Sequence, residues 1–229
     1  IKRKCAPLPW VDQVQHLGNT LQNDSSMSKD VMQKRGKFIR KVNSLLQEFH
    51  FTEPSTKLVN IHATSFYGSG TWNINSAECE KLYTSWNVTI RQIFNLDRCT
   101  HRHLIEPLSQ CLHPKVMIAS RFVTFYKSLI TSSKFGVRFL ARICERDNRT
   151  VLGNTLRQLL DKCSMAESGP DVLTAHIVKK KLVYFEMPME EQWRVPLLKE
   201  LLKVRQGNLK LGNMDNTEIS FLIDYLCTS

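Results

Sequence analysis

The sequence predicts a mainly α-helical protein with one short β element near its N-terminus. Apolar residues recur every three or four positions over most of the chain, which is the period of an amphipathic helix. Helix-starting and helix-ending residues separate these segments, and a small N-terminal segment alternates apolar and polar side chains instead. With 229 residues, 42% of them hydrophobic, the chain is long enough to bury a core.

The β element is expected at residues 10–22, where the alternation is frequent enough for a short strand or a hairpin. Gly18 would ease a bend within it. A loosely ordered arm is the alternative, because terminal segments are often poorly ordered. We assign residues 1–26 to this N-terminal unit.

A three-helix bundle is predicted for residues 27–96. Its first helix runs from Ser28 to Phe49, with an apolar stripe made of Val31, Phe38, Val42, Leu45 and Phe49. A second helix is predicted at 60–65, after Pro54. The third begins at a capping-box-like pair, Asn75 and Glu78. Its apolar face holds Leu82, Trp86, Ile90 and Ile93.

A helical C-terminal region is predicted for residues 97–229. Thr100 is the expected N-cap of a helix at 101–111, whose first turn would hold His101, Arg102 and His103. Further helices are expected at 114–131, 134–146 and 150–163.

The last third of the chain is harder to assign. Residues 172–187 are ambiguous, because the apolar cluster at 182–185 fits a strand or a helix. A helix that includes Trp193 is expected from Pro188 to Gly207, with a kink or restart at Pro196. A final helix is expected at 215–227.

The charge favours a polyanionic partner, either nucleic acid or an acidic membrane surface. The formal net charge is +11 and the pI is near 9.4. No apolar segment approaches the roughly 20 residues of a membrane span, and we expect no membrane partner. Seven scattered cysteines without a signal-peptide pattern favour reduced thiols in the cytosol or nucleus.

Five short motifs follow one another between residues 10 and 135. They are His16-Leu17-Gly18, the basic helix 28–49, Ser65-Phe66-Tyr67-Gly68-Ser69 with Trp72, Ser85-Trp86 with Arg91, and Thr100-His101-Arg102. In this order they resemble the region downstream of the polymerase active site in reverse transcriptases of LINE-type, non-LTR retrotransposons. Beyond residue 135 the resemblance is weaker. No motif is specific alone, but their order and spacing together are.

The resemblance implies that residues 1–26 end a palm domain, 27–96 form a helical thumb and 97–229 form a C-terminal extension. Enzymes of this family are RNA-directed DNA polymerases that copy RNA at a nicked chromosomal target, which implies a nuclear location. Their catalytic aspartates hold divalent magnesium upstream of the leucine-glycine strand, and the present sequence has no Asp-Asp pair. We therefore expect a non-catalytic fragment without a cofactor of its own. Its expected partners are RNA, DNA or an RNA–DNA hybrid, and the upstream palm and fingers.

Basic residues on helix faces are the expected contacts to the sugar-phosphate backbone. The first group comprises Lys34, Lys37, Arg40 and Lys41. The second group comprises Arg91, Arg98, His101 and Arg102. The third group comprises Arg121, Lys127, Lys134 and Arg138. For each residue, an ordinary solvated surface position is the alternative.

The sequence allows two other interpretations. Cys99, His101, His103, Cys111 and His113 form a metal-like cluster, but Cys99-x-His101 lacks the spacer of structural zinc sites, and we expect no metal there. The alternative function is a helical protein-interaction scaffold without enzymatic activity, in which the basic faces serve solubility or an acidic protein partner.

Overall fold

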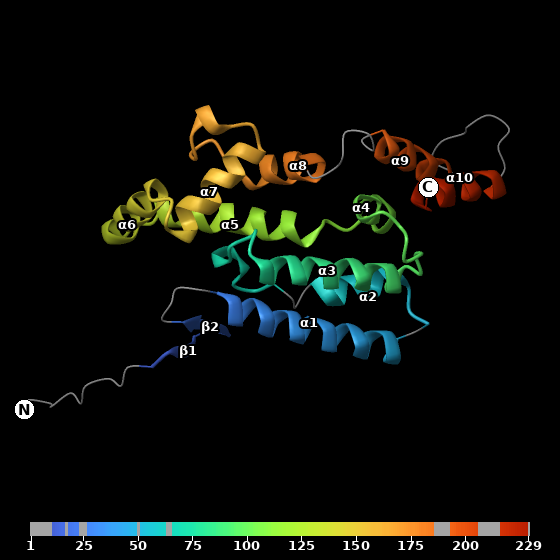
Figure 1. The fold of residues 1–229 in the computed structure, drawn as a ribbon, viewed down its shortest axis with the longest axis horizontal. Helices are drawn as coiled ribbons and strands as arrows, with labels where there is room; N and C mark the ends of the chain where they lie inside the picture. The colour runs from blue at the N-terminus through green and yellow to red at the C-terminus, as the bar shows by residue number, and fades with distance from the viewer. Residues whose placement is uncertain are drawn as a thin grey trace, which may run out of the picture.

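The computed structural model describes residues 11–16, 18–22, 27–49, 51–62, 66–185, 193–205 and 216–228. The fold is mainly α-helical with a two-stranded antiparallel sheet near the N-terminus, which confirms the predicted fold class (Figure 1). Strand β1 (Gln13–His16) pairs with β2 (Asn19–Gln22), with Val14 opposite Leu21. Gly18 has a φ of 78° in the turn, a left-handed conformation that glycine adopts readily. The predicted hairpin is thus confirmed.

Helix α1 (Ser28–Glu48) packs beside α3 (Ala77–Ile93) through buried apolar side chains. The rings of Phe38 and Trp86 stack with their centroids 5.6 Å apart. Phe49, predicted as part of the stripe, follows the helix and is exposed, because the helix ends one residue earlier. The N-cap of α3 is Ser76, whose hydroxyl accepts from the Cys79 N–H. The prediction that Asn75 and Glu78 cap this helix is therefore wrong.

Helix α2 (Pro54–His62) begins six residues earlier than predicted. Proline suits the first turn of a helix, where its missing N–H would have no helical partner. The predicted helix end at 63–65 lies outside the described residues. A short 3₁₀ helix, η1 (Ser69–Thr71), lies between α2 and α3.

The predicted helix at 101–111 is shorter than expected. A 3₁₀ turn, η2 (Arg102–Leu104), leads into α4 (Ile105–Ser109), and Gln110 ends α4 in a left-handed conformation. Thr100 is not an N-cap, because His101 holds that position and makes no side-chain capping bond. Thr100 is buried instead.

Helices α5 (Pro114–Ile130), α6 (Phe135–Arg146) and α7 (Val151–Lys162) confirm three predicted helices to within a residue at each end. Thr150 caps α7 by accepting from the Gly153 N–H. The ambiguous segment contains α8 (Ala175–Phe185), so the strand interpretation is wrong for those residues. Figure 1 shows α5 between α3 on one side and α7 and α8 on the other.

Helices α9 (Arg194–Arg205) and α10 (Asn216–Thr228) end the described chain. Trp193 precedes α9 rather than lying within it, and Pro196 is the third helical residue, where it breaks no helical hydrogen bond. The predicted start at Pro188 and end at Gly207 lie outside the described residues.

The described residues bury two hydrophobic cores. The larger one draws on α1, α2, α3, α5, α7 and α8, and it therefore includes side chains on both sides of residue 96. The smaller one joins Leu104 to residues of α9 and α10. The His101 N–H donates to the carbonyl of Cys227 over 3.3 Å, so the Thr-His-Arg turn is where the C-terminal helices dock.

Candidate nucleic-acid interface

A buried carboxylate joins the hairpin to the helical bundle. Asp30, in the first turn of α1, has only 1% of its surface exposed. One of its oxygens accepts from the Thr20 N–H over 3.0 Å, and the other accepts from Trp72 Nε1–H over 2.9 Å. These bonds fix the hairpin, α1 and the segment around Trp72 relative to one another. Sequence reasoning missed Asp30, because a first-turn aspartate ordinarily serves the helix dipole.

The aromatic-glycine segment packs on the hairpin turn. Gly68 has a φ of 80°, and a Cβ atom there would overlap the side-chain amide of Asn19. Phe66 is buried, with its ring centroid 5.8 Å from that of Trp86. Tyr67, between them, is 64% exposed. The segment therefore presents one aromatic ring at the surface beside the hairpin.

Lys34 connects this ring to the hairpin and to the basic face of α1. Its ammonium donates to the Gly18 carbonyl over 2.9 Å and lies 5.8 Å from the centroid of the Tyr67 ring. Lys37 and Lys41 follow at intervals of three and four residues, which places the three lysines along one flank of the helix. We call Lys34, Lys37 and Lys41 the lysine flank. Arg40 is exposed and neighbours Lys37 on the helix surface.

The second predicted group divides between structural and exposed positions. Arg91 donates from Nε and Nη2 to the Thr100 carbonyl, over 3.2 and 2.6 Å, and burial lowers the pKa of its guanidinium. It therefore holds the Thr-His-Arg turn against α3. Arg98 and Arg102 are exposed. His101 is half-buried, with its ring centroid 5.4 Å from that of His103.

Most side chains of the third predicted group form hydrogen bonds within the protein. Arg121 donates to the Phe66 carbonyl, and its guanidinium carbon lies 5.9 Å from the centroid of the Phe66 ring. Lys127 donates to the carbonyl of Asp171. Arg138 donates to the Ser132 carbonyl over 3.1 Å, while Lys134 is exposed. The structure thus places the first group on one helix, α1, which begins next to the hairpin. Arg121 of the third group bonds to the aromatic-glycine segment that Lys34 also contacts.

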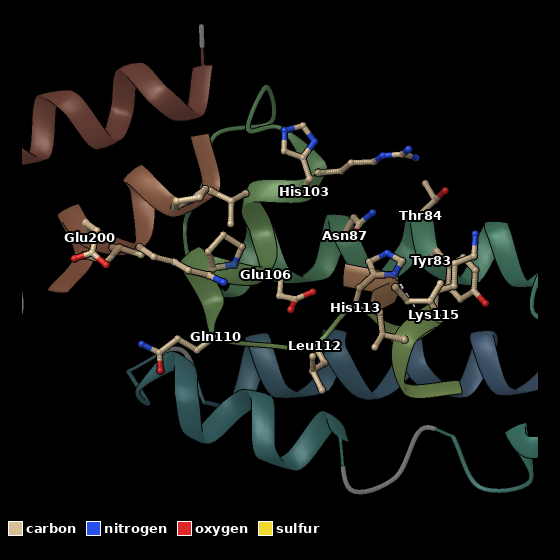
Figure 2. A pocket seen from close by; sticks show the side chains of 18 of the residues that line it. Tyr83, Thr84, Asn87, His103, Glu106, Gln110, Leu112, His113, Lys115 and Glu200 are labelled. Atoms are coloured by element: carbon tan, nitrogen blue, oxygen red, sulfur yellow. Dashed lines mark hydrogen bonds between the residues drawn. The ribbon is translucent and has the colours of Figure 1, made fainter. Parts of the chain in front are cut away.

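A pocket of about 590 Å³ lies at the junction of α3, η2, α4, α5 and α9. Figure 2 shows Glu106 extending from α4 into this pocket, with Asn87, His103 and His113 around it. Leu112 and Val195 are among the apolar residues that line it. The sequence predicted Arg102 as a contact to the sugar-phosphate backbone of a nucleic acid. It did not predict a pocket, because the pocket depends on how α9 docks.

Charged groups line the same pocket. Lys115 pairs with Glu80 over 3.5 Å, and Lys203 pairs with Glu200 over 2.8 Å. Burial raises the pKa of Glu106, while a hydrogen bond from the His113 backbone and the charge of Lys199 act against this rise. The side-chain oxygen of Asn87 is buried and accepts no hydrogen bond within the described residues.

The structure separates the two cysteines of the metal-like cluster by their burial. Cys99 is exposed, whereas Cys111 is buried and its thiol donates to the Ser109 carbonyl over 3.3 Å. Among the residues that the structure describes, no group of three or more His, Cys, Asp or Glu side chains could hold a metal ion.

Two of the motif residues, Leu17 and Ser65, lie outside the described residues. None of the helices in the described ranges is both long enough and apolar enough to cross a membrane. Comparisons of the chain with protein-family models, with curated proteins and with solved structures gave no match.

Proposed function

We propose that this chain is the non-catalytic, nucleic-acid-binding part of a LINE-type retrotransposon reverse transcriptase, an RNA-directed DNA polymerase. In this proposal the hairpin ends the palm, α1 to α3 form the thumb, and the later helices are a C-terminal extension. The upstream palm and fingers supply the catalytic aspartates and magnesium ions. The protein acts on a chromosomal target in the nucleus, and this part of it grips the template–primer duplex.

One arrangement carries the proposal: the lysine flank begins at Lys34, whose ammonium contacts both the hairpin turn and the exposed ring of Tyr67. From Lys34 to Lys41 the helix rises roughly 10 Å, a length over which one strand of a duplex presents about three phosphates. Lys34 uses one of its three donor hydrogens on Gly18 and retains two for an anion. The Asp30 bonds hold the hairpin and helix in place, so the cations are positioned before a ligand binds.

Replacing Lys37, Arg40 and Lys41 together with Gln tests this interface. We expect the affinity for an RNA–DNA hybrid, measured by filter binding at low salt, to fall about 10- to 100-fold, because the phosphates lose their cationic partners. The matched control replaces Arg157, Lys179 and Lys180 with Gln. These residues are exposed on α7 and α8, away from α1, and their loss changes the net charge equally. Equal losses in the two triple variants would remove α1 from the interface.

A protein-interaction scaffold is the second candidate, and α6 is the element that favours it. Its exposed apolar side chains are Phe135, Phe139, Leu140 and Ile143. The rings of Phe135 and Phe139 stack with their centroids 5.8 Å apart. Contiguous exposed apolar surface often marks a contact with another protein. A scaffold of this kind binds the hybrid weakly, and the two triple variants then behave alike.

A further inference from the structure

The pocket between α4 and α9 has the size and lining of a ligand site. Its volume of about 590 Å³ lies within the roughly 300–1,000 Å³ of small-molecule sites. The apolar part of its lining can enclose a flat ring, and it includes Pro107, Leu112, Val116, Val195 and Pro196. The polar groups differ between the interior and the mouth of the pocket, and this difference indicates the chemistry of the ligand.

One acceptor in this pocket has few donors. Glu106 points into the pocket and receives the backbone N–H of His113, which leaves most of the acceptor positions of its two oxygens for other donors. An enclosed acceptor without donors costs free energy, so a ligand that brings N–H groups to Glu106 is favoured here.

Buried Lys115 is paired with Glu80, and three further cations lie where the pocket meets solvent. Arg102, Lys199 and Lys203 all line the pocket and are exposed, and they come from η2 and α9. Lys203 is paired with Glu200. The positive charge of Lys199 is close enough to Glu106 to lower the pKa of its carboxyl group. The exposed guanidinium of Arg102 is suited to bidentate binding of a phosphate. A ligand with N–H donors at one end and a phosphate at the other satisfies both regions.

We propose that this pocket binds the guanine base of an unpaired nucleotide, with the base edge on Glu106 and the phosphate at Arg102. Guanine offers adjacent N1–H and N2–H donors to one carboxylate, whereas uracil offers one ring N–H and adenine and cytosine offer only an amino group. This inference rests on the proposed function for the source of the nucleotide, a single-stranded part of the bound nucleic acid. A free mononucleotide has the same chemistry.

Calorimetric titration of the whole chain with mononucleotides tests the pocket without any substitution. We expect guanosine 5′-monophosphate to bind about tenfold more tightly than the adenosine, cytidine and uridine monophosphates. Inosine 5′-monophosphate lacks only the 2-amino group and should bind about tenfold more weakly than the guanosine compound. Inorganic phosphate should bind more weakly than any nucleotide. Equal affinities for the guanosine and inosine compounds would overturn the proposal.

Glu106→Gln should weaken binding of guanosine 5′-monophosphate at least tenfold, because the amide replaces one acceptor oxygen with a donor. Glu48→Gln is the control, since Glu48 is exposed on α1 and bonded to Ser44, and it should leave the affinity unchanged. A guanosine affinity that survives Glu106→Gln contradicts the assignment of Glu106.

An RNA of six nucleotides with one guanosine identifies the source. Tighter binding of the oligonucleotide than of the mononucleotide assigns the pocket to a strand, and weaker binding assigns it to a free nucleotide. The proposed function is tested separately, because the Lys37, Arg40 and Lys41 triple variant should lose affinity for the hybrid and retain its affinity for the mononucleotide.

Discussion

A few polar residues position the surfaces described above, and Asp30 shows this most clearly. The pattern of α1 assigns it to the first helical turn, which is correct, but its two hydrogen bonds reach residues 10 and 42 positions away. Such partners depend on how elements pack and cannot be predicted from helical periodicity. The same holds for Arg91, a correctly placed helix residue whose guanidinium binds the Thr100 carbonyl instead of remaining exposed.

Asp30→Asn tests the junction between hairpin and bundle. Asparagine keeps one acceptor oxygen but turns a donor toward either the Thr20 N–H or the Trp72 N–H. We expect the free energy of unfolding to fall by about 1–3 kcal/mol, measured by urea denaturation. Asp161→Asn, at an exposed position of α7, is the control and should change it by less than about 0.5 kcal/mol. Equal stability of the two variants would show that the Asp30 bonds contribute little.

Glu106→Gln should change the pH dependence of stability. Because burial raises the pKa of Glu106 in the folded state above its value of 4.5 in solution, the folded protein holds this proton more tightly than the unfolded chain. The wild type therefore loses stability as the pH rises from the unfolded value through the folded one. The Tm of the variant relative to wild type should increase from about pH 4 to about pH 7. A constant difference across this range would contradict the raised pKa.

At the scale of elements, helices with a regular stripe and a clear starting residue were predictable. Helix α5 starts at Pro114, as predicted, and α7 starts at Val151, one residue after the predicted start. The errors occur where the chain turns over short distances. The 101–111 segment forms only η2 and α4, and its Leu104 is buried against α9 and α10, far along the chain. Local periodicity carries no information about that docking.

Gly68→Ala tests the packing of the aromatic-glycine segment on the hairpin. The added methyl group requires a left-handed backbone at a non-glycine residue and overlaps the Asn19 amide, so we expect a loss of about 1–3 kcal/mol in unfolding free energy. Gly136→Ala is the matched control, because a Cβ there meets open space in the first turn of α6. It should be neutral or stabilise by up to about 1 kcal/mol. Equal effects would show that Gly68 has no special role.

At the scale of the whole molecule, the net charge of +11 is spread over several surfaces with different local structure. The lysine flank begins beside the hairpin, and the pocket lies at the docking site of α9. Helix α6, with its exposed apolar side chains, lies at the end of the molecule away from α9 (Figure 1). Total charge predicted a polyanionic partner, but it could not tell which basic residues are free. Several of them stabilise the fold, including Arg91, Arg121 and Lys127.

The salt dependence of hybrid binding tests the central claim most directly. Each cation that neutralises a phosphate adds about 0.7–0.9 to the slope of log affinity against log salt. We expect the Lys37, Arg40 and Lys41 triple variant to have a slope shallower than wild type by about 2 to 3, and the Arg157, Lys179 and Lys180 control to match the wild type. A wild-type slope in the α1 variant would mean that Lys37, Arg40 and Lys41 do not contact the phosphates and would contradict the proposed grip.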